Sequence, residues 1–395
     1  MALTIGAPRE TYPGERRVAL TPRASEALGK LGASVIIEQS AGADAGFPDE
    51  QYVGRGAHVV SRAEVFQQSD IIVQVRALGA NPDDGRADLP LLRRGQLVIG
   101  FGEPLTAVRE MSDLARAGVS FFAMELMPRI TRAQSMDALS SMATIAGYRG
   151  VLLGAEALPK IFPMLMTAAG TITAARVLVL GAGVAGLQAI ATARRLGAVV
   201  SAYDVRSAVK EQIESLGAKF VVLDLETGAS EGQGGYAKAM DEEFYRRQRA
   251  ALQEVIREQD VLITTAAVPG KRAPILVTAQ MASAMAPGSV IVDIASERGG
   301  NCELTRPGET VMHQGISILG PLNLASTAPY HASQMYGSNV AAFLKLMVKN
   351  GELTINREDE IIRETLVTHG GEIVNARVSE LVGTTAAAMP AGERR

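Results

Sequence analysis

A glycine-rich hexapeptide at residues 181–186, G-A-G-V-A-G, has the spacing of a loop that holds the phosphates of a dinucleotide. The spacing alone is weak evidence, because the chain has 40 glycines. The flanking sequence strengthens the prediction of a phosphate-binding loop, because the hexapeptide directly follows an apolar run and opens an amphipathic segment. Gly181 permits the tight turn, Gly183 lets the backbone approach a pyrophosphate, and Gly186 allows close packing of helix on strand. The N–H groups at the helix start would then meet the phosphate charge.

An acidic residue follows at the distance that ribose recognition requires. Asp204 stands at the end of the next apolar run, 199–203, about 20 residues beyond the glycines, where a carboxylate accepts hydrogen bonds from ribose hydroxyls. A carboxylate there repels a 2′-phosphate, so the pattern favours NAD(H) over NADP(H). Arg206 is close enough in sequence to weaken that preference. The alternative interpretation is that Asp204 caps the next helix at the edge of the sheet.

A second polar segment, 129–140, follows the apolar run that ends near Ala123. Ligands of open α/β sheets gather at the carboxyl ends of strands, so this segment is a candidate site. Gln134 offers an amide, and Asp137 and Ser140 offer an acceptor and a donor, which together can orient an amide such as nicotinamide. The pattern fits equally well with a purely structural role, in which Ser135 or Asp137 caps the following helix.

The elements that must position these residues alternate between strands and helices, which predicts an α/β fold of two Rossmann-like lobes with parallel sheets. We expect the first lobe to be discontinuous, with residues 1–137 and 320–395, and the NAD(H)-binding lobe to cover 138–319. A long helix at 135–158, stopped by Pro159, would lead from the first into the second. The predicted strands are 35–37, 71–73, 97–99, 119–123, 177–180, 199–203, 220–223, 261–264, 290–294 and 316–319. The other predicted helices are 21–31, 106–117, 185–196, 209–216, 242–258 and 330–348.

The composition excludes several classes of protein. Hydrophobic residues make up 47% and charged residues 21% of 395, which is typical of a globular enzyme. The net charge of -3 and the lack of a basic cluster argue against nucleic-acid binding. Cys302 is the only cysteine, so no internal disulfide forms, and the four histidines show no metal-ligand spacing. With neither a signal peptide nor a spanning segment in the pattern, we expect a cytoplasmic protein.

Six segments spread along essentially the whole chain match one known family: 16–22, 124–137, 163–170, 181–188, 235–238 and 299–302. They resemble the NAD(H)-binding component, domain I, of proton-translocating NAD(P) transhydrogenase. In that family, domain I passes a hydride directly between its nicotinamide and NADP(H) on a separate domain. The resemblance implies a homodimer that works with a membrane-spanning proton-channel subunit and an NADP(H)-binding subunit. It therefore places the chain peripherally at the inner membrane.

The resemblance also implies roles for individual residues. Arg129, Gln134, Asp137 and Ser140 correspond to the family's nicotinamide-positioning side chains. Tyr236 corresponds to the tyrosine of a mobile loop; on composition alone its glycine-rich surroundings fit a lid or a solvated loop. The cofactor-binding residues that we expect are Gly181, Ala182, Gly183, Val184, Gly186, Asp204, Val205, Arg206, Tyr236 and Ala266.

Two alternatives share the fold. Alanine dehydrogenase, a relative with a similar opening segment, would need a lysine and a histidine in the first lobe. The sequence has Val75-Arg76-Ala77 at the place of the lysine and 101–104, F-G-E-P, at the place of the histidine, which disfavours amino-acid oxidation. The other alternative is a catalytically silent NAD-binding partner subunit, against which the intact Gln134 and Asp137 argue.

Overall fold

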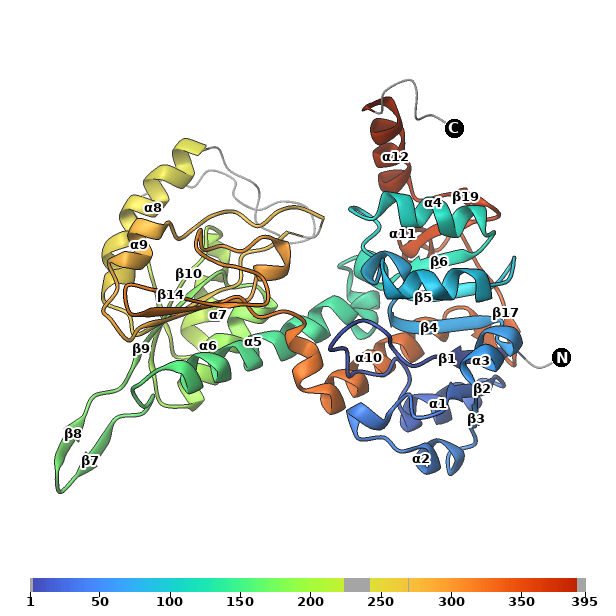
Figure 1. Ribbon diagram of the computed structural model, residues 1–395, viewed down its shortest axis with the longest axis horizontal. Coiled ribbons are helices and arrows are strands. Elements are labelled where there is room, and N and C mark those ends of the chain that lie inside the picture. Colours follow the sequence, from blue (N-terminus) through green and yellow to red (C-terminus); the bar gives the residue numbers. More distant parts are fainter. Residues whose placement is uncertain (1–2, 224–241, 269, 389–395) are drawn as a thin grey trace. The chain divides into compact units, whose positions relative to one another are not determined.

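The computed structural model describes residues 3–223, 242–268 and 270–388 (Figure 1). The chain divides into two compact units, which we call unit 1 (Met1–Met142 with Ala328–Arg395) and unit 2 (Ala143–Thr327). Each unit is built on a mainly parallel sheet covered by helices. The predicted fold class, two Rossmann-like lobes of which the first is discontinuous, is confirmed.

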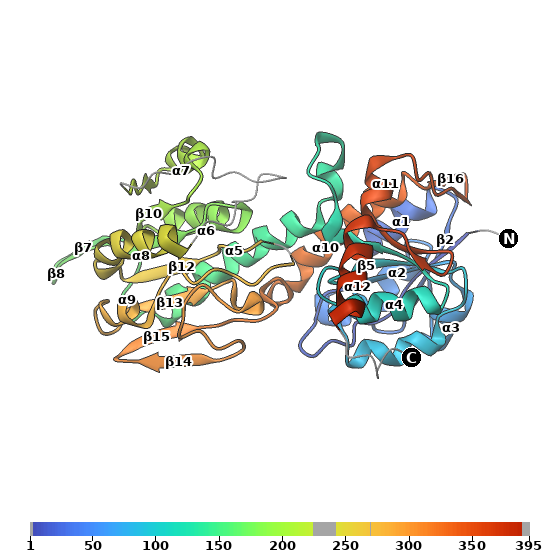
Figure 2. The same cartoon turned by 90° about the horizontal axis from the view of Figure 1, so that it is seen from above.

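The sheet of unit 1 has eight strands in the order β19-β18-β6-β5-β4-β1-β2-β3 (Figure 1). In Figure 2, helices α1 (Pro22–Gly29) and α4 (Val108–Arg116) lie on opposite sides of this sheet. The pairs from β6 to β3 are parallel, whereas β18 runs antiparallel to β6 and β19 antiparallel to β18. The C-terminal segment of the chain thus extends the first sheet. The strands are β1 Thr4–Ala7, β2 Ser34–Glu38, β3 His58–Val60, β4 Ile71–Arg76, β5 Leu97–Phe101, β6 Ser120–Ala123, β18 Leu366–His369 and β19 Glu372–Ile373.

Some helices of unit 1, such as α1, α3 and α11, begin at a capping side chain. For α1, Pro22 stands at the start and the Thr21 hydroxyl accepts a hydrogen bond from the Ala24 N–H at 3.3 Å. For α3, Ser61 and Glu64 form a complete capping box. The helices are α1 Pro22–Gly29, α2 Asp49–Val53, α3 Arg62–Gln68, α4 Val108–Arg116, α10 Pro329–Leu344, α11 Glu360–Thr365 and α12 Ala376–Ala388, and the long helix α5, Ala138–Ala157, begins in this unit.

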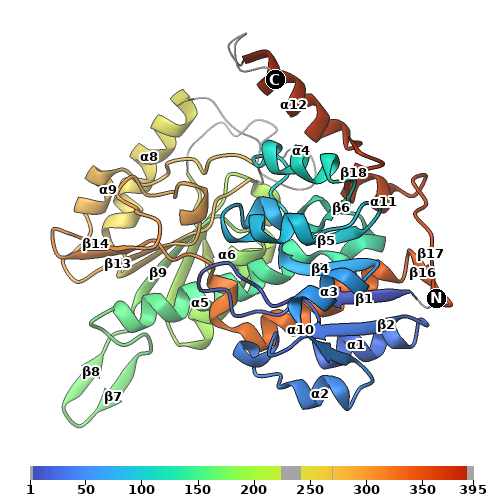
Figure 3. The same cartoon turned by 45° about the vertical axis from the view of Figure 1, so that its right-hand side comes forward.

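The sheet of unit 2 has seven strands in the order β11-β10-β9-β12-β13-β15-β14, parallel except for β14. A separate hairpin, β7–β8, projects from this unit (Figure 3). The strands are β7 Leu165–Thr167, β8 Gly170–Ile172, β9 Arg176–Leu180, β10 Val199–Tyr203, β11 Lys219–Phe220, β12 Val261–Thr264, β13 Val290–Asp293, β14 Thr310–His313 and β15 Ile316–Leu319. The helices are α6 Val184–Arg195, α7 Lys210–Ser215, α8 Glu242–Arg257 and α9 Ala279–Ser283.

Strand β9 shows how the sheet of unit 2 is buried on both faces. Val177 and Val179 belong to the apolar cluster that includes Ile190 of α6, whereas Leu178 and Leu180 belong to the cluster on the opposite face. Because successive side chains of a strand point to opposite faces, one apolar run serves two cores. Burial of each such side chain stabilises the fold by about 1.5–3 kcal/mol. The glycine loop therefore starts from a fixed strand end.

Three predicted elements are wrong in extent. The helix expected at 330–348 ends at Leu344, because a tight turn at Asn350-Gly351, both with positive φ, pairs the short strands β16 (Val348–Lys349) and β17 (Glu352–Leu353). The strand expected at 220–223 is confined to Lys219–Phe220, because its register with β10 ends at the pair Ala202–Phe220, with the Val221 N–H still donating to the Ala202 carbonyl at 2.8 Å. The helix expected from Ser135 begins at Ala138, because Thr131–Met136 form a 3-10 helix instead.

Candidate functional site

The glycine loop of unit 2 combines two crowded glycines with one open glycine. Gly181 has φ +96°, and a Cβ there would lie 2.8 Å from the Thr265 Oγ1; at Gly186 a Cβ would lie 1.8 Å from the Gly181 carbonyl oxygen. At Gly183 a Cβ would meet nothing within 4 Å. Gly183 is also the N-cap of α6, and no side chain accepts there from the helix N–H groups. An uncapped helix start beside open space fits a pyrophosphate, so these residues suit a bound dinucleotide.

Asp204, at the end of β10, is tied to this loop. Its Oδ2 accepts a hydrogen bond from the Ala182 N–H at 2.7 Å, and its carboxylate takes a forked ion pair from the Arg206 guanidinium, with both contacts at 2.9 Å. Both side chains are mostly buried. The carboxylate therefore lies beside the glycine loop, where the ribose role requires it. It also accepts from the Arg206 N–H at 2.9 Å, which is a local turn contact of the kind that the alternative interpretation expected.

We expect Asp204→Asn to reduce the preference for NADH over NADPH by about tenfold, or ~1.4 kcal/mol. The substitution keeps an oxygen for the Ala182 N–H, but it removes the charge that repels a 2′-phosphate and releases Arg206 from its ion pair. Titration of wild type and variant with each nucleotide, followed by NAD(P)H fluorescence, measures the ratio of dissociation constants. An unchanged ratio would show that Asp204 does not set the preference.

The loop after β12 lies against the glycine loop, because β12 is the parallel neighbour of β9. The Thr265 N–H donates to the Leu180 carbonyl at 2.9 Å, and its hydroxyl donates to the Gly181 carbonyl at 2.9 Å. A Cβ on Gly181 would lie 3.2 Å from the Ala266 nitrogen. Strand order reverses beside β9, and this switch point is where open α/β sheets bind ligands. The sequence indicated Ala266 but not Thr265.

Of the expected cofactor-binding residues, the structure places all but one at the carboxyl ends of β9, β10 and β12. Val205 follows Asp204 at the end of β10, and Val184 opens α6. Tyr236 lies outside the described residues. The residues brought together are Gly181, Ala182, Gly183, Val184, Gly186, Asp204, Val205, Arg206 and Ala266.

In unit 1 the polar segment 129–140 follows β6 and is firmly held. The Arg132 guanidinium makes a forked ion pair with Asp359, at 2.7 and 2.9 Å, which lowers the pKa of that carboxyl. The Asn339 side chain of α10 donates to the Ser135 carbonyl at 2.8 Å. Arg129 and Gln134 are both exposed. The loop therefore presents these two side chains from a fixed backbone.

Asp137 and Ser140 form a pair at the start of α5. The Ser140 N–H donates to the Asp137 Oδ1 at 2.9 Å, and its hydroxyl donates to the other oxygen at 2.5 Å. Asp137 thus acts as a helix cap, which is one of the two roles expected from the sequence. Both residues are half-buried. All four residues that we expect to orient a nicotinamide therefore lie on one segment of unit 1: Arg129, Gln134, Asp137 and Ser140.

Glu125 is an acidic residue near this segment that the sequence did not indicate as functional. Its Oε1 accepts hydrogen bonds from the N–H groups of Gly102 (2.8 Å) and Glu103 (2.6 Å), which join the ends of β5 and β6. Its Oε2 is buried and has no partner among the residues that the structure describes. Burial of the carboxyl group, together with the Glu103 carboxylate, raises the pKa of Glu125 to about 7.

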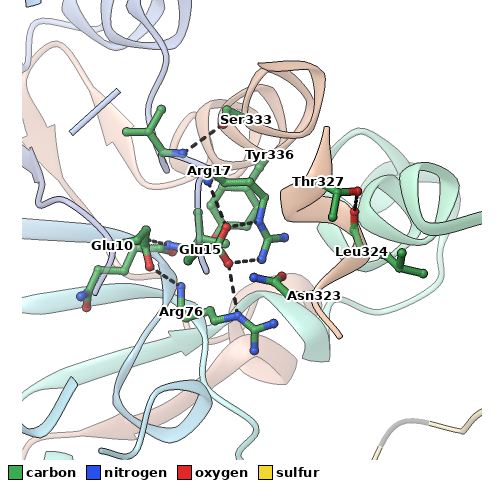
Figure 4. Close-up of polar contacts among 12 residues, drawn as sticks. Glu10, Glu15, Arg17, Arg76, Asn323, Leu324, Thr327, Ser333 and Tyr336 are labelled. Atoms are coloured by element: carbon green, nitrogen blue, oxygen red, sulfur yellow. Dashed lines mark hydrogen bonds and ion pairs between the residues drawn. The ribbon is translucent and has the colours of Figure 1, made fainter. Parts of the chain in front are cut away.

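A buried ion cluster fills the switch point of the unit 1 sheet, between β1 and β4 (Figure 4). Glu15 takes a forked ion pair from Arg17, at 2.7 and 2.6 Å, and a further contact of 3.3 Å from Arg76. Burial alone would raise the pKa of Glu15, but Arg17 outweighs it and lowers the pKa to about 2. Burial and the Glu15 charge raise the pKa of Glu10 to about 8. Arg76 is thus a member of this cluster.

Among the described residues, no group of three His, Cys, Asp or Glu side chains is arranged to hold a metal ion. Within the same ranges of the chain, no helix has the length and apolar character needed to cross a membrane.

The chain matches two family models, Alanine dehydrogenase/PNT, N-terminal domain, over residues 6–146, and Alanine dehydrogenase/PNT, C-terminal domain, over residues 150–376. It is 45% identical to the Rhodospirillum rubrum protein named as the first part of NAD(P) transhydrogenase subunit alpha, over 94% of this chain and 98% of that protein. The crystal structure of transhydrogenase from Sinorhizobium meliloti is similar with a TM-score of 0.85 and 44% identity, covering 94% and 100% of the two chains. An L-alanine dehydrogenase structure has a TM-score of 0.78 and 26% identity, with 97% and 99% covered.

Proposed function

The chain belongs to the alanine dehydrogenase/PNT family, and from this premise we propose that it is the NAD(H)-binding subunit of a proton-translocating NAD(P) transhydrogenase. Relatives at 43–46% identity are named as the alpha subunit of that oxidoreductase. The observation that carries the proposal is the open helix start at Gly183 beside the buried Asp204. It offers a place for the pyrophosphate and ribose of a dinucleotide.

The bound nicotinamide would supply the chemistry, exchanging a hydride between its C4 and the C4 of an NADP(H) ring on a partner subunit. The residues of this chain bind and orient. Exposed Gln134 and Arg129 offer an amide and a cation toward the carboxamide, and the Asp137–Ser140 pair offers an acceptor. Direct hydride transfer needs no general base, which agrees with a segment of amide, hydroxyl and carboxylate groups.

The proposed partners are an NADP(H)-binding subunit and a membrane-spanning proton-channel subunit. The Rhodospirillum relative is named as only the first part of an alpha subunit, so at least one further polypeptide belongs to that complex. This chain would accordingly lie at the cytoplasmic face of the inner membrane, held there through its partners.

We further propose that the chain is a homodimer in which the β7–β8 hairpin contacts the second copy. The hairpin and its base carry large apolar side chains that are well exposed, with Met166 79% and Met164 59% accessible. A groove of about 600 Å³ lies at its base, lined by Leu158, Ile161, Phe162 and Leu196 among others. A two-fold dimer would let each hairpin cover apolar surface of the other copy.

We expect Met166→Asp to convert the dimer to a monomer, because a charge buried at the proposed contact costs several kcal/mol. Light scattering after size-exclusion chromatography measures the mass. Met312→Asp is the matched control, since Met312 of β14 is 64% exposed in the same unit, and it should leave the mass unchanged. A dimer that survives Met166→Asp would place the interface elsewhere.

Alanine dehydrogenase is the second candidate, because the fold and the family are shared. The first lobe has Arg76 in the buried ion cluster and Phe101 packed near the Tyr336 ring, at 5.4 Å between centroids, where that enzyme would need a lysine and a histidine. Nucleotide titrations and an L-alanine oxidation assay with NAD+ separate the two. Binding of NADH well above NADPH, without turnover of alanine, supports the proposal. Turnover of L-alanine by the purified chain would overturn it.

A further inference from the structure

The segment Gly299–Cys302 resembles the transhydrogenase family in sequence, yet the proposed function gives it no role. In the structure it forms a loop that contacts the loop after β12 through Asn301 and Ala266. Gly299 and Gly300 have φ of +92° and +78°, so two successive residues adopt the left-handed conformation that favours glycine. This turn directs the N–H groups of Asn301 and Cys302 at the carboxylate of Asp293, at 2.7 and 2.9 Å.

Asp293, at the end of β13, is completely buried, and its carboxylate anchors this loop by hydrogen bonds. Besides the two N–H groups, its carboxylate accepts from the Thr264 hydroxyl at 2.8 Å and the Thr305 hydroxyl at 2.7 Å. A buried carboxylate with this many donors holds its partners rigidly. A Cβ on Gly300 would lie 2.7 Å from the Asp293 Oδ2, which excludes a larger residue at that position.

Asn301, whose backbone is held by Asp293, in turn holds the loop after β12 that lies beside the glycine loop. Its side chain is fully buried and forms hydrogen bonds to both polar groups of Ala266: Oδ1 accepts from the Ala266 N–H at 2.9 Å, and Nδ2 donates to the Ala266 carbonyl at 2.8 Å. Nδ2 also donates to the Pro274 carbonyl at 2.9 Å. The carboxamide thus pairs with Ala266 as a neighbouring strand would, just beyond the end of β12.

We propose that Asn301, anchored by Asp293, is a positioning residue for the portion of the cofactor that lies beyond the pyrophosphate, toward the nicotinamide. Ala266 follows β12 and lies next to Gly181 at the switch point. Strands β12, β13 and β15 form the half of the sheet on the other side of β9 from β10, whose end carries the proposed ribose ligand Asp204. By its two hydrogen bonds to Ala266, Asn301 holds in place the backbone that would contact this portion of the cofactor. The inference rests on the proposed NAD(H) function.

The test compares NADH with 5′-AMP, which occupies only the adenosine half. Asn301→Asp is nearly isosteric and keeps the acceptor for the Ala266 N–H, but it loses both donors and brings a carboxylate against two carbonyl oxygens. We expect calorimetric titration to show NADH binding weakened at least about tenfold and AMP binding changed by less than about twofold. Asn350→Asp, the same change at an exposed turn, is the control that should alter neither.

Equal weakening of both nucleotides, or of neither, by Asn301→Asp would overturn the inference while leaving the NAD(H) proposal intact. If the wild type does not bind NADH, the proposed function itself fails. Hydrogen exchange on the wild-type protein covers the case of a variant that does not fold. The Ala266 amide should be protected as strongly as the amides of β12, because it donates to a buried side chain. If the Ala266 amide exchanges as fast as the amides of an exposed loop, Asn301 does not hold Ala266 in place, and the inference is wrong.

Discussion

Gly183→Ala is expected to weaken NADH binding at least about tenfold while changing the stability of the fold by less than about 1 kcal/mol. The reason is that Gly183 has φ -75°, which alanine adopts readily, and a Cβ there meets no protein atom within 4 Å. The added methyl group would project into the space that we assign to the pyrophosphate. The methyl group would therefore reduce the affinity for NADH far more than the stability of the fold.

Gly186→Ala, in the same hexapeptide, is the matched comparison. Its Cβ would lie 1.8 Å from the Gly181 carbonyl oxygen, so the helix must move away from the strand, at a cost on the order of 3 kcal/mol. Thermal unfolding and NADH titration of the two variants separate the effects. Gly183→Ala should melt like the wild type and bind poorly, whereas Gly186→Ala should melt early. If Gly183→Ala binds NADH normally, the pyrophosphate does not lie at this helix start.

Asp137→Asn is expected to slow hydride transfer by on the order of 100-fold, with little effect on folding. Asparagine is as good a helix cap as aspartate, so the α5 start keeps an acceptor for the Ser140 N–H. The negative charge that we assign to the nicotinamide site is lost. Asp137→Ala removes the cap as well and should additionally destabilise the protein by about 1 kcal/mol.

The measurement is the single-turnover rate of transfer with saturating cofactor, alongside urea unfolding. Asp83→Asn, an exposed carboxylate of the same unit, should leave both unchanged. If Asp137→Asn transfers hydride as fast as the wild type while Asp137→Ala is only less stable, then Asp137 is a helix cap and no more.

Local patterns were enough to predict the strand–helix alternation, because buried parallel strands read as continuous apolar runs and α1 has a clear cap at Thr21. The position of Asp204 beside the glycine loop was also predictable, because it depends on spacing along one βαβ unit. Short elements were not. The turn at Asn350-Gly351 ended α10 early, and the pairing of β7 with β8 involves three-residue strands without buried faces.

Residues whose roles depend on contacts distant in sequence were missed for a different reason. Asn301 reaches Ala266 across 35 positions, and Glu125 joins strand ends through the N–H groups of Gly102 and Glu103. An asparagine after two glycines and a glutamate after a strand are common, so neither pattern indicates the partner. For Asp137, the sequence left a cap and a nicotinamide ligand open, and the structure shows the cap.

The proposed direct exchange of hydride between this chain and NADP(H) on a partner subunit can be measured with purified proteins. The most direct measurement mixes the purified chain with a separately purified NADP(H)-binding subunit, NADPH and an oxidised NAD analogue whose reduction is followed by absorbance. We predict reduction that requires both proteins and is lost with Gly183→Ala in this chain. A chain that binds NADH yet gives no transfer with the partner would contradict the proposed function and indicate a silent NAD-binding subunit.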